Sequence, residues 1–253
     1  MSKVFPKDAE GNTHIGRWFL SVKLKNFWNP KTLIFDCDGV ILNSNEVKRE
    51  AFRRVALPFG QDAADKFVHF HLRNGGMSRY QKFKYFLEEV VPIHSRPASQ
   101  TAGAYLTISD LSATFASYIS NGLKTCEIAP GLDNLRKLMP RISWMVVSGS
   151  DQQELRQVLY ERGVAHYFDA GIFGSPDSKD LIFKREIDSG RIVQRAFYLG
   201  DSFYDYQVAQ RAGIEFIYVS GWSEDANRTA FKSANHLNSV ENLLELIEKA
   251  YKQ

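Results

Sequence analysis

Cysteine is scarce in this chain, because only Cys37 and Cys126 occur among 253 residues. Two cysteines cannot build a disulfide scaffold or a four-cysteine zinc site. The chain also lacks an apolar run approaching the roughly 20 residues needed to cross a bilayer. Its first residues contain a lysine but neither an apolar segment nor a cleavage signature, so they do not predict a secretion signal. These absences favour a protein of the reducing cytoplasm.

A large excess of charge of one sign is missing as well. Thirty-two Lys and Arg residues oppose 29 Asp and Glu residues, which leaves a formal net charge of +3. Spread over this length, so small an excess does not indicate a nucleic-acid or membrane-surface binder. We therefore expect no nucleic-acid and no membrane partner, and the sequence leaves monomer and homodimer open. The length suits one large domain, or one domain that carries a second lobe by insertion.

The second half of the chain alternates apolar runs with helix-like stretches. Short apolar runs suit the buried strands of a parallel sheet, and they occur at residues 32–35, 143–147, 196–199 and 216–219. Helical patterns occupy residues 131–139, 151–163, 178–187 and 204–212, and a tail helix follows Asn238 and Ser239, which we expect to cap it. This alternation predicts an α/β fold with a doubly wound, Rossmann-like parallel sheet.

The stretch between the first two strands is helical only. Apolar residues recur at helical spacing over residues 46–57, 62–73, 78–91 and 105–121. A parallel crossover needs only a dozen or so residues, so the excess predicts a second lobe. We therefore divide the chain into an N-terminal extension (1–30), a catalytic core (31–45 and 125–253) and a helical cap (46–124).

Polar residues follow the predicted strands at their carboxyl ends, where ligands bind in open α/β sheets. They are Asp36 and Asp38 after the first run, Ser148, Gly149 and Ser150 after the second, Lys179 at the start of a helix, and Asp201 and Asp205 after the run that ends at Leu199. Four crowded carboxylates cannot all stay ionised without a cation, and Mg²⁺ accepts such oxygen ligands together with phosphate oxygens. Lys179 adds a point charge suited to phosphate, while Ser148 and the backbone N–H groups after it can bond the phosphate oxygens. The set predicts a phosphoryl-transfer centre.

Four segments, taken in order, resemble the motifs of the haloacid dehalogenase superfamily. They are Asp36-Cys37-Asp38-Gly39-Val40, Val146-Val147-Ser148, Lys179 in its GSPDSKD context, and Leu199-Gly200-Asp201-Ser202 with Asp205. The spacing of the first two is similar to that of the subclass with an α-helical cap, which includes phosphoglycolate phosphatase-like and β-phosphoglucomutase-like enzymes. The resemblance covers about residues 31 to 250.

The resemblance implies a role for each of these residues. Asp36 would be the nucleophile that forms an aspartyl-phosphate, and Asp38 would be the acid/base that protonates the leaving oxygen and then activates water. Ser148, together with the N–H of Gly149, would hold the transferring phosphoryl group, and Lys179 would neutralise it. Mg²⁺ would be bound by the Asp36 carboxylate, the Asp38 backbone carbonyl and Asp201, with Asp205 as a further carboxylate acting directly or through water.

The predicted cap offers weaker signals. Its segment Asn74-Gly75-Gly76-Met77-Ser78-Arg79 resembles the substrate-contacting loop of β-phosphoglucomutase-like proteins, which implies that Arg79 binds the far end of the substrate. We expect Arg73, Lys82 and Lys84 on solvated faces. The histidines show no metal-ligand spacing, and we expect them in surface or packing roles. Near the hinge, this chain has Asn43-Ser44-Asn45-Glu46, whereas related sequences usually read Asp-Ser-Glu or Asp-Thr-Glu. A neutral residue thus replaces an acidic one at the hinge, which bears on how the cap closes.

The sequence therefore predicts a Mg²⁺-dependent phosphatase that acts on a small phosphorylated metabolite, most readily a sugar phosphate. Dehalogenases of the superfamily lack an acid at the position of Asp38, so dehalogenation is disfavoured. Phosphonatase activity is disfavoured too, because the characteristic first-motif region of those enzymes is not matched here. A sugar phosphomutase remains an alternative, since it would use the same aspartyl-phosphate. A non-catalytic module of a larger biosynthetic protein remains another, motivated by the unassigned first 30 residues.

Overall fold

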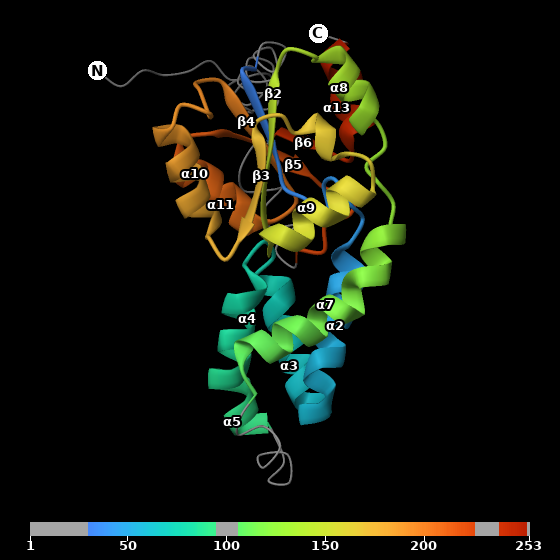
Figure 1. Ribbon diagram of the computed structural model, residues 1–253, viewed down its shortest axis with the longest axis vertical. Coiled ribbons are helices and arrows are strands. Elements are labelled where there is room, and N and C mark those ends of the chain that lie inside the picture. Colours follow the sequence, from blue (N-terminus) through green and yellow to red (C-terminus); the bar gives the residue numbers. More distant parts are fainter. Residues whose placement is uncertain (1–29, 95–105, 226–237, 252–253) are drawn as a thin grey trace, which may run out of the picture.

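The computed structural model describes residues 30–94, 106–225 and 238–251, so the predicted N-terminal extension lies almost wholly outside the described residues. Six parallel strands form one sheet in the order β3-β2-β1-β4-β5-β6 (Figure 1). The strands are β1 (Thr32–Phe35), β2 (Ser143–Asp151), β3 (Gly171–Ser175), β4 (Ala196–Gly200), β5 (Glu215–Val219) and β6 (Asn238–Val240). The prediction of a doubly wound parallel sheet is confirmed.

Both faces of the sheet are covered by helices, because successive side chains of a strand point to opposite faces. Leu33 and Phe35 of β1 pack into one hydrophobic cluster, while Ile34 packs into the other. In Figure 1, α10 (Lys179–Asp188) and α11 (Phe203–Ala212) lie on one side of the sheet, and α8 (Leu132–Leu138), α9 (Gln152–Glu161) and α13 (Leu243–Tyr251) lie on the other.

Two strands, β3 and β6, were not predicted from the sequence patterns. β3 contains glycine at two of its five positions, so its apolar run is too short to stand out. β6 spans only three residues, and it includes Asn238 and Ser239, for which a helix-capping role was wrong. Asn238 instead pairs with Ile217 of β5, and the tail helix begins later, where the Asn242 side chain accepts a hydrogen bond from the N–H of Glu245.

The helices that follow β1, up to Thr125, gather at one end of the sheet, in the lower part of Figure 1. They are α2 (Asn45–Ala56), α3 (Gln61–Arg73), α4 (Arg79–Tyr85), the π-helical turn Phe86–Val90, α5 (Val91–His94) and α7 (Ile108–Thr125). Their shared core is aromatic: the ring of Phe52 lies 4.3 Å from that of Phe115 and 5.4 Å from that of Phe67, measured between centroids. We call this group of helices the cap.

Local signals fix the limits of the cap helices. α7 begins after Thr107, whose hydroxyl accepts the N–H of Asp110 while the Asp110 carboxylate accepts the N–H of Thr107, which is a complete capping box. Ser78 caps α4 through the N–H of Gln81. Within the described ranges, no helix is both long enough and apolar enough to span a membrane.

We predict that the aromatic cluster carries the stability of the cap. Phe67 is fully buried against Phe52, Phe83 and Phe86. Phe67→Ala should therefore lower the free energy of unfolding by about 3–5 kcal/mol. Urea denaturation followed by circular dichroism measures the loss. The control is Tyr160→Ala, because Tyr160 is 78% exposed and should change stability by less than about 0.5 kcal/mol. Equal losses in the two variants would contradict the assignment.

Candidate active site

A buried lysine joins two of the predicted site carboxylates. Lys179, at the start of α10, places Nζ 3.1 Å from Oδ2 of Asp36 and 2.5 Å from Oδ1 of Asp205. Lys179 and Asp36 are only 1% and 2% exposed, so little water screens the pair. Burial lowers the pKa of Lys179, but the two carboxylates more than reverse this and raise it above its ordinary value. Lys179 is therefore a permanent cation behind Asp36.

Asp205 is held by four hydrogen bonds within the protein. Oδ1 accepts from Lys179 and from the hydroxyl of Tyr198 at 2.7 Å, and Oδ2 accepts from the hydroxyl and the backbone N–H of Ser202. The bond from the Ser202 N–H, together with the bond from the Asp205 N–H to the Ser202 hydroxyl, forms the capping box that starts α11. With both oxygens engaged, Asp205 contributes its charge while its geometry is fixed. Its role as a direct metal ligand stays a prediction.

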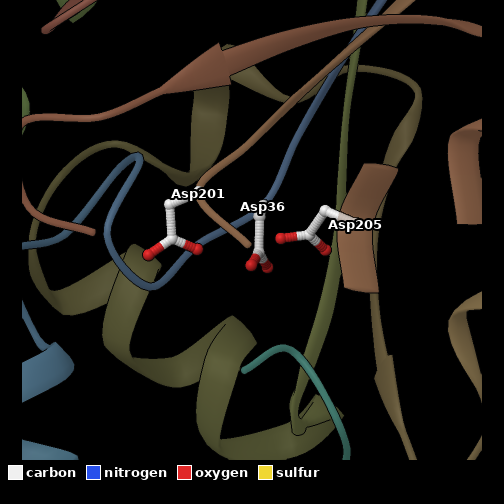
Figure 2. A group of neighbouring side chains, drawn as sticks. All are labelled: Asp36, Asp201 and Asp205. Carbon is white, nitrogen blue, oxygen red and sulfur yellow. The ribbon is translucent and has the colours of Figure 1, made fainter. Parts of the chain in front are cut away.

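Three carboxylates converge at the carboxyl edge of β1 and β4. Asp36 lies between Asp201 and Asp205 in Figure 2, and ligand oxygens of all three lie within 4.8 Å of one another. Burial, followed by repulsion from Asp205 and Asp36, raises the pKa of Asp201 well above its ordinary value. Burial also raises the pKa of Asp36, and despite the opposing charge of Lys179 it reaches about 7. One ammonium cannot balance three carboxylates, so the donor set fits a cation with oxygen ligands.

Glycine at position 39 is required for this arrangement. Gly39 has a φ of +73°, and a Cβ atom there would lie 2.1 Å from Oδ2 of Asp201 and 2.5 Å from Nδ2 of Asn45. The loop after Asp38 can therefore pass close to Asp201 only without a side chain. Asn45 uses the space, since its amide donates to Oδ2 of Asp201 at 2.7 Å and to the carbonyl of Trp222 at 2.9 Å.

Asp38 is held by a different set of partners. Its Oδ2 accepts from Lys48 Nζ at 2.6 Å and from Ser150 Oγ at 2.9 Å, and its Oδ1 accepts from Ser44 Oγ at 2.6 Å. Burial alone would raise the pKa of Asp38, but Lys48 and the two hydroxyls bring it down to about 2. Lys48 lies on α2, so a cap residue fixes the charge of a core carboxylate. Without the substrate, Asp38 is ionised at neutral pH.

The strand β2 brings Ser148 and Gly149 to the same edge. Ser148 is fully buried, and its hydroxyl hydrogen-bonds that of Ser150 at 3.2 Å. Gly149 lines a cavity of about 70 Å³ between the sheet edge and the cap, together with Asp36, Asp38 and Asp201. A Cβ atom on Gly149 would lie 2.3 Å from the carbonyl oxygen of Gly76, so the cap loop crosses directly over this glycine.

Further contacts hold the cap closed over the sheet edge. Arg79 at the start of α4 forms a two-pronged ion pair with Glu154 of α9, in which Nη1 lies 3.2 Å from Oε2. The guanidinium also lies 4.8 Å from the centre of the Phe115 ring. The hydroxyl of Tyr80 donates to Asp151 at 2.8 Å. Arg79 lines the cavity, and its predicted contact with substrate remains a prediction.

Lys82 corrects the sequence analysis. It is 3% exposed and lines the cavity, so the expectation of a solvated face was wrong for this residue, whereas Arg73 and Lys84 are exposed as expected. Its Nζ lies 2.8 Å from Nδ1 of His71 on α3. Burial, followed by the charge of Lys48, lowers the pKa of Lys82 to about 7. Burial and the charge of Lys82 lower the pKa of His71 well below its ordinary value.

Several site residues were not predicted as such from the sequence. The set acts through side-chain contacts between different helices, strands and loops, which motifs do not reveal: Asn45, Lys48, His71, Lys82 and Tyr198. Lys82 alone carried a local signal, because it lies on the same helical face as Arg79, Phe83 and Phe86, and that face is buried. A lysine within an apolar helical face predicts a buried cation.

We predict that Lys82 makes the unliganded protein less stable at low pH. Its pKa is about 7 in the folded state and 10.5 ordinarily. Between these values the unfolded chain binds more protons, so this residue's cost to stability falls as pH rises through that window. Lys82→Met should stabilise the protein by roughly 1–3 kcal/mol at pH 6, and by less at pH 9.

Urea denaturation of wild type and variant at both pH values measures this difference. Lys84→Met is the control, because Lys84 is exposed on the same helix and should alter stability little at either pH. A gain for Lys82→Met that is equal at pH 6 and pH 9 would contradict the lowered pKa.

Solved structures share this fold. CbbY from Rhodobacter sphaeroides in complex with phosphate is 19% identical and has a TM-score of 0.62, over 86% of this chain and 96% of that one. A CbbY variant with xylulose-(1,5)bisphosphate is 17% identical, with a TM-score of 0.63 over 85% and 96%. A predicted phosphoglycolate phosphatase from Haemophilus somnus is 16% identical, with a TM-score of 0.62 over 88% and 98%. At these identities the likeness shows the fold.

A search of curated proteins finds no match to this chain. A family model described as haloacid dehalogenase-like hydrolase, however, matches residues 33–219, which is most of the chain and includes the sheet edge, the cap and the cluster around Lys179. The resemblance seen in the four motifs is thereby confirmed. This chain belongs to the haloacid dehalogenase-like hydrolase family.

Proposed function

We propose that the protein is a Mg²⁺-dependent phosphatase that hydrolyses a small phosphorylated metabolite through an aspartyl-phosphate on Asp36. The observation that carries the proposal is the position of Asp36, which lies beside the cation Lys179, in a cluster with Asp201, and lines a cavity with Asp38. A carboxylate that attacks a phosphate dianion must overcome charge repulsion, and cations at its side lower that barrier.

Mg²⁺ would be held by the carboxylates of Asp36 and Asp201 and the backbone carbonyl of Asp38, and would neutralise negative charge shared by the nucleophile and the phosphoryl group. Asp205, whose oxygens are engaged by Lys179, Tyr198 and Ser202, would act on the ion through its charge or through water. Lys179 would balance the opposite side of the Asp36 carboxylate.

In the first step, an oxygen of Asp36 forms a bond to phosphorus, and the bond from phosphorus to the leaving oxygen breaks. Asp38 gives its proton to that leaving oxygen. Asp38 is ionised in the unliganded site, so it must first take up a proton, and the negative charge of an arriving phosphate favours this by raising its pKa. Ser148 and the N–H of Gly149 would orient the phosphoryl oxygens.

In the second step, Asp38 accepts a proton from water, and the oxygen of that water forms a bond to phosphorus. The bond between Asp36 and phosphorus then breaks, which releases inorganic phosphate, restores the Asp36 carboxylate and leaves Asp38 protonated for the next cycle. The ion pair with Lys48 keeps Asp38 in the deprotonated form that can accept the proton of water. Asp38 therefore acts as a protonated acid in the first half of the reaction and as a deprotonated base in the second.

The substrate class that we propose is a sugar phosphate. The cavity of about 70 Å³ is smaller than the roughly 300–1,000 Å³ of most ligand sites, so the cap must open to admit the substrate. We propose that the cap (46–124) moves against the core (31–45 and 125–253), and that the pair of Arg79 with Glu154 re-forms on closure, with Arg79 facing the substrate. The structure of CbbY with a sugar bisphosphate supports this substrate class.

We predict that Asp36→Asn abolishes hydrolysis while leaving the fold intact, because an amide cannot form the acyl-phosphate. The release of inorganic phosphate from an aryl phosphate in the presence of Mg²⁺ should fall by at least about 10³-fold. Asp62→Asn is the matched control, since Asp62 is exposed on α3 and should retain full activity. Equal activity of Asp36→Asn and wild type would remove Asp36 from the mechanism.

A sugar phosphomutase would use the same aspartyl-phosphate but return the phosphoryl group to a second hydroxyl. We predict hydrolysis, because Asp38 held as an anion by Lys48 is suited to activate water. Incubation with glucose 1-phosphate, followed by phosphorus NMR, should show inorganic phosphate accumulating. Formation of glucose 6-phosphate without inorganic phosphate would favour the mutase instead.

A further inference from the structure

The end of the cavity that faces the cap contains three cations in different states. Arg79 is paired with Glu154, and Lys48 is paired with Asp38. Lys82 has no carboxylate within 4.0 Å in the described part of the chain, and its hydrogen-bond partner is the His71 ring. Two of the three charges are thus already balanced, and Lys82 is the one whose charge is left over.

The surroundings of Lys82 make an unbalanced charge costly. Its Nζ lies 5.3 Å from the centre of the Phe52 ring, and Phe52 and Phe115 form apolar walls of the cavity. An ammonium group has three N–H donors, and the contact with Nδ1 of His71 uses one of them. A buried ammonium that lacks a counter-charge is unfavourable unless a ligand supplies that charge.

The position and the charge of His71 also leave the ammonium group of Lys82 available to an anionic ligand. Its lowered pKa keeps the ring neutral, so it accepts from Lys82 without adding a competing charge. His71 also lines the cavity. Lys82 therefore presents its ammonium group to the cavity, and Nδ1 of His71 holds one of the three N–H bonds of that group in place. Burial, followed by the charge of Lys48, lowers the pKa of Lys82.

We propose that Lys82, oriented by His71, binds a second anionic group of the substrate at the cap end of the cavity, while the phosphoryl group lies at Asp36. This inference rests on the proposed function and makes it more specific. The substrate is a compact molecule with an anion at each end, because Lys82 and Asp36 line the same small cavity of about 70 Å³. Sugar bisphosphates and phosphorylated sugar acids have this chemistry.

Arg79 is less suited to supply this selectivity. Its charge is matched by Glu154, so an anion that approaches Arg79 meets a neutral pair and must displace a two-pronged contact. An anion that approaches Lys82 displaces nothing. Arg79 thus aligns the cap with the core, and Lys82 distinguishes substrates by charge.

The test compares pairs of related substrates in which one member carries a second anion and the other does not. Fructose 1,6-bisphosphate is compared with fructose 6-phosphate, and 6-phosphogluconate with glucose 6-phosphate, so that the first pair reports a second phosphate and the second a carboxylate. Wild type should prefer one or both doubly anionic members in kcat/KM. Lys82→Met should lose roughly 10–100-fold on the preferred member and change less than about threefold on its partner. Lys84→Met should behave as wild type.

Binding to Asp36→Asn, measured by calorimetry with the same four probes, separates this inference from the proposed function. A preference for the doubly anionic probes that disappears in Asp36→Asn/Lys82→Met supports the inference even if no probe is hydrolysed. Equal loss on both members of each pair, in turnover and in binding, would overturn it, as would a wild type that binds and hydrolyses both members equally well.

Discussion

The buried ammonium of Lys179 is the contact on which the site depends. It reaches from the start of α10 to Asp36 after β1 and to Asp205 in α11, and so ties together three elements of the sheet edge. Removing its charge would leave two buried carboxylates facing each other. A buried ion pair that loses one partner is strongly destabilising, so these residues constrain one another. The ammonium also holds the Asp36 carboxylate in one orientation.

The same cluster is incomplete by charge. Asp201 joins Asp36 and Asp205 within 4.8 Å, and a single lysine cannot balance all three. Burial, together with repulsion from the neighbouring carboxylates, raises the pKa values of Asp36 and Asp201. A divalent cation would relieve this excess of negative charge, and the proposed phosphoryl site would then have positive charge on both sides. The family to which the chain belongs is consistent with this chemistry.

The core could be predicted because its signals are local. Strands at Thr32–Phe35 and Ala196–Gly200 are short apolar runs, and the polar residues predicted for the site follow them at once in sequence. Strands β3 and β6 could not be predicted, since one is rich in glycine and the other spans three residues whose burial comes only from the sheet. At such positions, contacts with the rest of the sheet outweigh the intrinsic strand propensity of the residues.

The cap side of the site could be predicted less well, because its chemistry arises from contacts between separate helices and loops and not from a motif within one segment. Lys48 acts on Asp38, Asn45 on Asp201, and Glu154 on Arg79. Each of these pairs joins a residue on a cap helix to a residue outside those helices, so the position of the cap and the charge state of Asp38 and Asp201 are linked. A motif identifies the carboxylates, but only the packed structure identifies the cations that face them.

Binding of Mg²⁺ to the unliganded protein tests this charge balance most directly. Calorimetry at neutral pH should detect Mg²⁺ binding to wild type, and the melting temperature should rise with Mg²⁺ concentration. Asp201→Asn removes one charge from the cluster without changing its shape. It should lower the affinity for Mg²⁺ by at least about tenfold and reduce the rise in melting temperature accordingly. Undiminished Mg²⁺ binding in Asp201→Asn, or none in wild type, would contradict the account.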